Sequence, residues 1–185
     1  MLHTEPASDP ATLRAQAEEN FRFLADFIPQ LVWFTDPTGY HTYFNQRWTD
    51  FTGYTLADSV GPDMWNHLLH PDDQQRARQV WGEALATGHD YEIEYRFRGK
   101  GGLYRWFLGQ ARPQRDAQGR IRQWYGTCTD IHDQKQTELA LRQREQELER
   151  AYADLEVKVA FRNLELEREV HALRRRLGEE LGGQH

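Results

Sequence analysis

YEIEYRFRGKGGLYRWFLGQAR, residues 91–112, decides the fold of this chain. Apolar and polar side chains alternate strictly over residues 91–97, as they do in a strand with one buried face. The glycine-rich GKGG at 99–102 is typical of a turn, and a second extended run fills residues 103–112. The stretch therefore predicts two antiparallel strands joined by a short loop.

Three further extended runs surround this hairpin. PTG at 37–39 is a turn between the first two runs, and DAQG at 116–119 is a turn before the last. Residues 46–88 have the pattern of short helices that end in a longer helix over 72–86. This order predicts an α+β fold, with a five-strand antiparallel sheet and helices on one face. The three runs are LVWFTD (31–36), YHTYFN (40–45) and IRQWYGTCTDI (121–131).

NHLLHPDD at 66–73 has the residue types of a metal site but the order of a helix start. Pro71 fits the first helical position, and the two aspartates after it lie in the first turn, where the helix dipole favours carboxylates. Pro71 also disfavours helical geometry at the residue before it, so His67 and His70 do not share a helical face. We therefore interpret this stretch as a helix N-terminus and expect no metal.

The N-terminal segment predicts one amphipathic helix. Asp9 is suited to the N-cap and Pro10 to the first helical position, while Pro29 ends the pattern. Apolar residues then recur on one face of this helix. They are Leu13, Ala17, Phe21, Leu24 and Ile28.

Composition excludes several classes of protein. The chain has 185 residues, 38% of them hydrophobic and 28% charged, and a net charge of −6, which argues against a nucleic-acid-binding protein. It has no apolar run long enough to span a membrane and no secretion signal in MLHTEPASDP. The single cysteine, Cys128, excludes an internal disulfide and a multi-cysteine zinc site. We expect a cytoplasmic protein, or the cytoplasmic part of a larger one.

The last 50 residues predict one long helix with a coiled-coil seam. Apolar residues recur there at steps of four and three, with Glu145 and Asn163 at polar seam positions. Two steps of four in succession, at Leu155, Val159 and Asn163, form a stutter that locally unwinds the supercoil. A parallel homodimer is favoured over a single helix packed on its own domain. The seam consists of Leu141, Leu148, Tyr152, Leu155, Val159, Asn163, Leu166, Val170, Leu173 and Leu177.

An ordered series of sequence blocks resembles the PAS sensory domain family, in particular the subfamily common in bacterial histidine kinases. The resemblance covers about residues 20–132. It implies a sheet of strand order 2-1-5-4-3 and a small cavity between the sheet and the helices. The blocks are VWFTDPTGYHTYFN (32–45), WTDFTGYT (48–55), HLLHPDD (67–73), YEIEYRFRGKGGLYRWF (91–107) and DAQGRIRQWYGTCTDI (116–131).

The resemblance also implies a signal relay where the last strand meets the long helix. The family closes on Asp-Ile-Thr, and this chain reads Asp130-Ile131-His132, with histidine in place of threonine. We expect Asp130 to anchor the start of the output helix by an ion pair or a cap. The expected organisation is a flexible N-terminus (1–10), an amphipathic helix (11–28), a PAS sensory domain (29–132) and a coiled-coil signalling helix (133–181).

The cavity implied by the resemblance has no firmly predicted cofactor. A photoactive flavin domain requires a cysteine in the helical region, and GPDMWNHLL (61–69) has none. Haem is disfavoured, because isolated histidines are weak evidence for an axial ligand. A small polar ligand and a ligand-free cavity filled by aromatic side chains both remain open. The candidate cavity-lining residues are Trp33, Tyr43, Trp65, Arg105 and Tyr125.

The leading functional interpretation is a sensory module that transmits a signal through a dimeric coiled coil to an effector. The resemblance implies the input region of a histidine kinase in two-component signal transduction. The chain has no catalytic constellation and His171 lacks the context of a phosphoacceptor, so we expect no enzyme here and an effector, kinase or cyclase, outside this chain. The alternatives are a haem- or flavin-binding gas or redox sensor and a PAS dimerisation scaffold without ligand.

Overall fold

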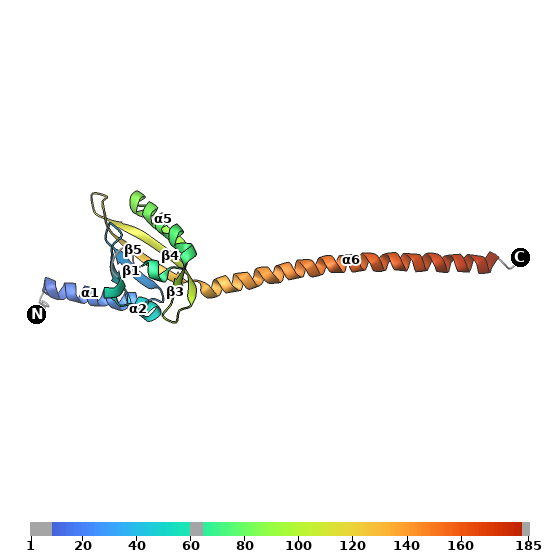
Figure 1. The fold of residues 1–185 in the computed structure, drawn as a ribbon, viewed down its shortest axis with the longest axis horizontal. Coiled ribbons are helices and arrows are strands. Elements are labelled where there is room, and N and C mark those ends of the chain that lie inside the picture. Colours follow the sequence, from blue (N-terminus) through green and yellow to red (C-terminus); the bar gives the residue numbers. More distant parts are fainter. Residues whose placement is uncertain (1–8, 60–64, 183–185) are drawn as a thin grey trace, which may run out of the picture. The chain divides into compact units, whose positions relative to one another are not determined.

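A five-strand antiparallel sheet forms the centre of the globular part (Figure 1). The computed structural model describes residues 9–59 and 65–182, including all side chains in these ranges except those of Leu56, Trp65, Asn66 and residues 177–182. The strand order β2-β1-β5-β4-β3 confirms the order expected from the sequence. The elements are α1 (Pro10–Phe27), β1 (Leu31–Thr35), β2 (His41–Phe44), α2 (Gln46–Thr52), α3 (Leu56–Ser59), α4 (Trp65–Leu68), α5 (Pro71–Thr87), β3 (Tyr91–Arg98), β4 (Tyr104–Arg115), β5 (Ile121–Asp130) and α6 (His132–Gly182).

The predicted hairpin forms between β3 and β4. Its register places Tyr95 opposite Phe107, both of them buried, and Arg96 opposite Trp106 on the other face. β4 then pairs with β5 along its length, and β5 pairs with β1. The strict alternation over 91–97 therefore sorts side chains between two faces, an inner face toward the helices and an outer face.

Aromatic side chains fill the inner face of the sheet. Two glycines of the sheet make room for them. A Cβ at Gly126 would overlap the Trp33 ring, and a Cβ at Gly109 would overlap the Tyr95 ring. At both sites glycine allows a large ring to lie directly on the backbone of the neighbouring strand. The fully buried aromatic residues are Trp33, Trp48, Trp124, Tyr95, Phe97 and Phe107.

The HPDD stretch starts helix α5 and also ties it to the edge of the sheet. His70 is the N-cap, and its Nδ1 accepts a hydrogen bond from the backbone N–H of Asp72. Asp73 is buried, and its carboxylate accepts hydrogen bonds of 2.9 Å from both the backbone N–H and the Nε of Arg96 on β3. The helix start expected from the sequence is confirmed, whereas the pairing with Arg96 was not expected. Among the described residues no group of histidine, cysteine and acidic side chains is arranged to hold a metal ion.

Asp73→Asn is expected to lower the free energy of unfolding by about 2 kcal/mol near neutral pH, because a buried charge-assisted pair is broken. Burial acts to raise the pKa of Asp73, but the hydrogen bonds from Arg96 outweigh it and hold the pKa below its ordinary value. A lowered native pKa stabilises the fold above the pKa of the unfolded carboxyl, and the effect is lost as pH falls through the native value. The difference between wild type and variant should therefore begin to shrink as pH falls below about 4, and it should be smaller at pH 3 than at neutral pH.

Urea unfolding of both proteins at neutral pH and at pH 3 measures this difference. Asp72→Asn is the matched control. Asp72 is largely exposed and lies 3.3 Å from Arg96, so its removal should cost less than about 0.5 kcal/mol. Equal losses for the two variants, or a difference as large at pH 3 as at neutral pH, would contradict the assignment.

Helix α1 is attached to the sheet through one buried amide. Asp9 occupies the N-cap and Pro10 the first turn, as expected, and the helix ends at Phe27, before Pro29. The side-chain amide of Asn45 donates to the Ala25 carbonyl of α1 and accepts from the Val32 N–H of β1. This connection holds the end of α1 beside the first strand.

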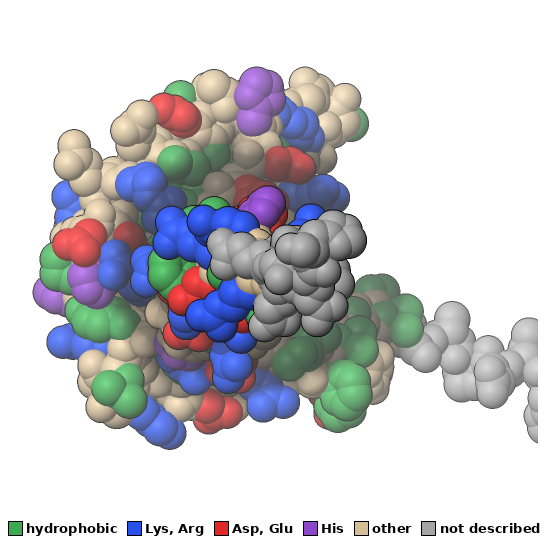
Figure 2. Space-filling view, turned by 90° about the vertical axis from the view of Figure 1, so that its right-hand side faces the viewer, with side chains coloured by type: hydrophobic (Ala, Val, Ile, Leu, Met, Phe, Trp, Pro, Cys, Tyr) green, Lys and Arg blue, Asp and Glu red, His purple; other side chains and the backbone are tan. Residues whose placement is uncertain are grey.

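The surface of the protein carries charges of both signs. Figure 2 shows basic and acidic side chains interleaved over the visible face.

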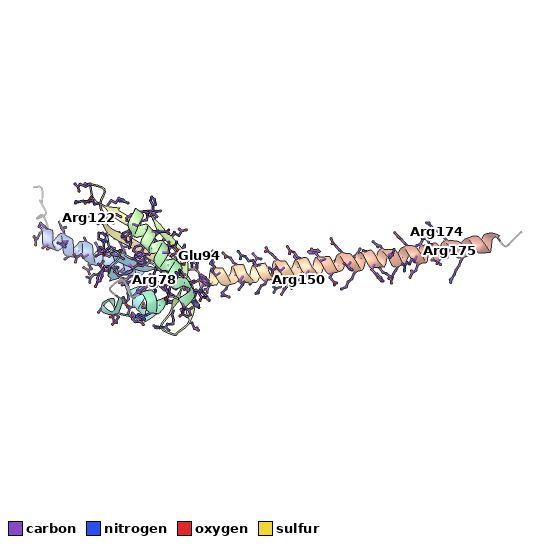
Figure 3. All side chains as sticks on the ribbon, turned by 45° about the horizontal axis from the view of Figure 1, so that its top comes forward. Arg78, Glu94, Arg122, Arg150, Arg174 and Arg175 are labelled. Carbon is purple, nitrogen blue, oxygen red and sulfur yellow. The ribbon has the colours of Figure 1, made fainter. Side chains whose placement is uncertain are left out.

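Helix α6 runs from His132 to Gly182. The chain divides into two compact units, one up to Lys135 and one from Gln136 onward, so the first turn of α6 belongs to the globular unit. Along the rest of α6 the side chains project outward, including those of Arg150, Arg174 and Arg175 (Figure 3). No helix in the part of the chain that the structure describes combines the length and the apolar character needed to cross a membrane.

Candidate functional site

The space between the inner face and the helices is occupied by packed rings. Trp81 of α5 lies edge-on to both Trp33 and Trp124, with centroid distances of 5.6 and 5.3 Å. Phe44 stacks on Trp48 of α2 at 4.3 Å. Such close ring packing leaves little room for a large planar cofactor at this position.

The single cysteine lies within this core. The indole Nε1 of Trp33 donates to the Cys128 Sγ at 3.3 Å, and the Tyr95 hydroxyl lies 3.2 Å from the same sulfur. Burial raises the pKa of the Cys128 thiol to about 12, despite the hydrogen bonds from Tyr95 and Trp33. Cys128 is therefore a neutral core residue and a poor nucleophile at physiological pH.

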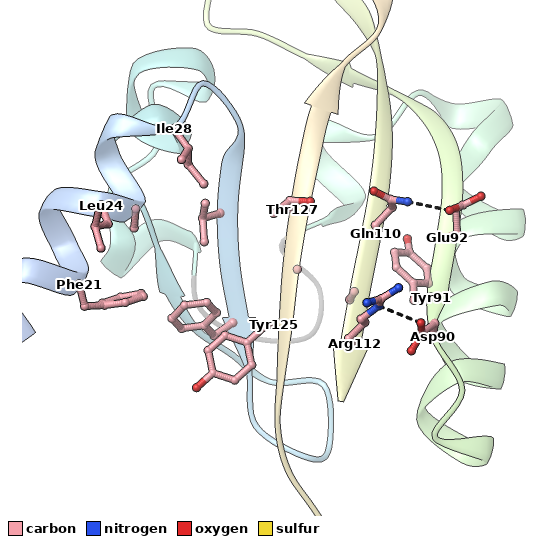
Figure 4. Close-up of a pocket in the computed structure, with 15 residues that line it drawn as sticks. Phe21, Leu24, Ile28, Asp90, Tyr91, Glu92, Gln110, Arg112, Tyr125 and Thr127 are labelled. Atoms are coloured by element: carbon pink, nitrogen blue, oxygen red, sulfur yellow. Dashed lines mark hydrogen bonds and ion pairs between the residues drawn. The ribbon is translucent and has the colours of Figure 1, made fainter. Parts of the chain in front are cut away.

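A groove of about 650 Å³ lies on the outer face, between α1 and the sheet (Figure 4). Its apolar end is formed by Phe21 and Leu24 of α1, by Ile28 directly after this helix, and by Phe34 of β1. Tyr125 of β5 contacts Phe34 at a ring distance of 4.4 Å and lies at the middle of the groove. The α1 side of this groove is thus an apolar surface open to the surroundings.

The far end of the groove is polar. Arg112 of β4 pairs with Asp90 at 2.9 Å, and Gln110 donates to Glu92 at 2.7 Å (Figure 4). The groove therefore combines an apolar wall with charged groups that already have partners. This combination suits an amphipathic occupant better than a purely apolar one.

The candidate cavity-lining residues are distributed over both faces of the sheet. Trp33 lies in the inner core, Tyr43 contacts Phe21 and Phe34 on the outer face, and Tyr125 lines the outer groove. Arg105 lies at the start of β4, where it pairs with Asp130. The side chain of Trp65 lies outside the described residues.

The junction between β5 and α6 is bridged by one guanidinium. Arg105 Nε lies 2.6 Å from Asp130 Oδ2, and Arg105 Nη2 lies 3.1 Å from Asp133 Oδ1 in the first turn of α6. The hydrogen bond to Asp130 raises the pKa of Arg105, so the bridge stays charged. Asp130 Oδ1 also accepts the backbone N–H of His132 at 2.9 Å. Asp130 thus makes both an ion pair and a helix-start hydrogen bond.

A second set of contacts holds the same turn against the outer face. The Ile131 N–H donates to the Trp106 carbonyl, and Lys135 Nζ lies 2.6 Å from Glu94 Oε2. Lys135 and Arg96 both lie over the Trp106 ring, at 5.9 and 5.1 Å. Arg96, already bonded to Asp73, therefore connects the start of α5 to the start of α6 through Trp106.

His132 occupies the position where the family has threonine. Its Nδ1 is buried and has no hydrogen-bond partner in the described part of the chain. This nitrogen therefore takes no part in the polar contacts of the junction. The bridging at this junction is supplied by Arg105 and Lys135 instead.

The seam predicted for α6 is exposed in the single chain. Leu155 is 54% and Leu166 is 43% exposed, and Asn163 lies among them. Apolar residues repeated along one helical face form a surface suited to packing against another helix. Leu177 belongs to the same pattern, but its side chain lies outside the described residues.

The comparison with known families agrees with the fold. The model of a family described as "PAS fold" matches residues 41–128. This part of the chain is a PAS domain. Among solved structures, a sensory box histidine kinase/response regulator from Burkholderia thailandensis is 27% identical, with a TM-score of 0.53, and the match covers 71% of this chain and 98% of that one. An RNA-binding light-oxygen-voltage receptor shares the fold at 19% identity, with a TM-score of 0.61 over 79% of this chain and 42% of that one.

Curated relatives of the PAS domain are much longer proteins. An uncharacterized protein, y4lL, of Sinorhizobium fredii is 35% identical over 82% of this chain and 18% of its own length. The peroxide stress-activated histidine kinase mak1 of Schizosaccharomyces pombe is 30% identical over 66% of this chain and 7% of its own length. The sensor protein FixL of Bradyrhizobium diazoefficiens is 31% identical over 46% of this chain and 17% of its own length. The chain thus spans less than a fifth of each of these relatives.

Proposed function

We propose that this chain is a sensory PAS module that transmits a signal through a dimeric coiled coil to an effector, as the input region of a histidine kinase. The observation that carries the proposal is the junction, where Arg105 joins the end of β5 to the first turn of a helix with an exposed apolar seam. The similarity to sensor kinases supports the choice of effector. PAS domains are sensory and non-catalytic, so catalysis belongs to the effector.

Charges beside the seam favour a parallel dimer in register. In such a dimer, the residue that directly precedes a core position on one helix contacts a residue on the partner helix. That contact residue has a sequence number five higher. Every such pair in α6 in which both residues are charged has opposite signs. An interaction of this kind sets orientation and register more than it adds stability. The pairs are Arg144 with Glu149, Arg162 with Glu167, and Glu169 with Arg174.

The stutter gives the seam two alternative packings. Around Val159, the side chains that face the partner helix can follow either the heptad pattern before the stutter or the pattern that begins at Asn163. The free energies of these two packing arrangements differ by only a few kcal/mol. A change at the sheet that alters the Arg105 bridge then biases one of them. This is a population shift, and it needs a difference in stability of only about 1–3 kcal/mol.

Cysteine cross-linking tests both steps, since Cys128 is buried and does not interfere. Leu155→Cys and Val159→Cys should form interchain disulfides on mild oxidation, and Arg150→Cys, on the outer side of the helix, should form them at least about tenfold more slowly because its sulfurs are too far apart. Adding Asp130→Asn should change the ratio of the Val159→Cys and Leu155→Cys rates by about twofold or more.

Asp116→Asn is the matched control for Asp130→Asn. Asp116 is also paired with an arginine, Arg120 at 2.9 Å, but it lies in the turn between β4 and β5. Asp116→Asn should leave the ratio of the Val159→Cys and Leu155→Cys cross-linking rates unchanged. Equal cross-linking at positions 150, 155 and 159 would refute the seam, and equal ratios for the two aspartate variants would refute transmission through the junction.

The packed inner core favours one alternative, a PAS scaffold that dimerises without a ligand in that space. If the protein is such a scaffold, the same dimer should form, but Asp130→Asn should not change the ratio of the cross-linking rates at positions 159 and 155. A haem or flavin sensor is less well supported, because tryptophan rings occupy the corresponding region. A Soret or flavin band in the absorbance spectrum of freshly purified protein would restore that alternative.

A further inference from the structure

A second apolar stripe lies on α6, away from the seam. It consists of Ala153, Val157, Ala160, Phe161 and Leu164, all of them exposed. Val157 is 68% and Phe161 is 64% exposed. At 3.6 residues per turn, the stripe lies roughly 150° around the helix from the seam residues of the same segment. A two-helix coiled coil through the seam therefore leaves this stripe facing outward.

The stripe has the spacing of a helix-docking surface. Its members follow the i, i+4, i+7 and i+8 pattern by which amphipathic helices engage one another. Outward positions nearer the ends of α6 are mostly polar, as at Gln146, Arg150 and Arg168. Apolar outward residues are thus concentrated in the three turns around the stutter, with Leu139 near the start of α6 as an isolated exception.

Both flanks of the stripe are acidic. Glu149, Glu156 and Glu167 lie on one side, and Glu147, Asp154 and Glu165 lie on the other. Asp154 pairs with Lys158, and Glu165 pairs with Arg162, but these are exposed pairs within the helix and can exchange partners at little cost. In the parallel register above, Glu156 faces Ala151 and has no cation opposite it. The stripe therefore presents an apolar centre between two negative rims.

We propose that the second stripe docks an amphipathic protein helix whose own apolar face is bordered by lysine and arginine. The proposal rests on the dimer of the proposed function, which leaves the stripe outward. A second copy of α6 fits poorly, because its stripe would set acidic rims against acidic rims in either orientation. A partner with basic rims meets the same surface with complementary charge.

The test uses the full chain and two labelled synthetic helices of about 21 residues, each with an apolar face and with either Lys or Glu at the flanking positions. Fluorescence anisotropy should show binding of the Lys-flanked peptide, weakened by added salt, and at least about tenfold weaker binding of the Glu-flanked one. Val157→Gln with Phe161→Gln should reduce binding at least about tenfold, as loss of an aromatic anchor does. Gln146→Ala, on the same side but outside the stripe, should bind as wild type does.

Charge reversal provides the sharper result. Asp154→Lys with Glu156→Lys places one cation on each flank among the four acids that remain, and should reduce the preference for the Lys-flanked peptide at least about threefold. The proposal is overturned if neither peptide binds, if the two bind equally, or if Val157→Gln with Phe161→Gln binds as wild type does.

Light scattering separates the remaining explanations. The stripe variant should keep the dimeric mass of the wild type. A tetrameric wild type that becomes a dimer in the variant would place a second copy on the stripe, and a variant that becomes monomeric would make the stripe the dimer seam; either result overturns the proposal. A monomeric wild type counts against the proposed function, whereas the peptide preference still decides what the stripe binds.

Discussion

A chain carrying Leu155→Glu and Leu166→Glu is expected to be monomeric at micromolar concentrations. Both leucines are exposed in the single chain and lie at seam positions on either side of the stutter. A buried leucine contributes about 2 kcal/mol or more, and a carboxylate in its place adds the cost of burying a charge, so the dimer should weaken at least about 100-fold. Light scattering or sedimentation equilibrium measures the change.

Arg150→Glu with Arg168→Glu is the matched control for this seam variant. It also introduces two glutamates into the same helix, but at outward positions that do not lie in the seam. We expect it to leave the mass unchanged. A dimer that survives the leucine substitutions, or one that is lost equally in both variants, would show that the chains do not associate through this seam.

Gly126→Ala should have the largest effect on stability in the globular unit. Its Cβ would overlap the ring of Trp33, which is fully buried and bonded to Cys128, so the ring has nowhere to move. Overpacking of this kind costs about 3 kcal/mol or more, so the variant is expected to unfold at a much lower urea concentration than the wild type. Urea unfolding followed by tryptophan fluorescence gives the difference.

Gly82→Ala makes the same chemical change with the opposite expected sign. Gly82 lies within α5, and a Cβ there meets nothing within 4 Å. Alanine should therefore stabilise the helix by about 0.5–1 kcal/mol. Wild-type stability in Gly126→Ala would mean that Trp33 does not lie on the β5 backbone as described.

The sequence was sufficient for the sheet because local patterns specify it. The alternation over 91–97 and the turn at 99–102 predict the β3–β4 hairpin directly, and the order of the elements leaves few sheet topologies. The start of α5 was predictable for the same reason, since Pro71 and the following aspartates act within one turn. Such features depend on neighbours in the chain.

Contacts between distant residues were not predictable in this way. Asp73 and Arg96 are 23 positions apart, and only the approach of α5 to the edge strand brings them together. The alternation of side chains along a strand predicts that Trp106 and Phe107 lie on opposite faces of the sheet. It does not predict that Lys135 covers the Trp106 ring. The outer groove depends on where α1 lies, which is set by the buried amide of Asn45 and has no signature in the helix itself.

The placement of Cys128 has a consequence for the chemistry of the stimulus. Oxidation, alkylation and disulfide exchange all begin with a thiolate that a reagent can reach. The sulfur of Cys128 is fully buried, protonated and held between Trp33 and Tyr95. The folded domain should therefore be indifferent to the redox state of its surroundings at this position, and a thiol reagent should modify Cys128 only after the domain unfolds.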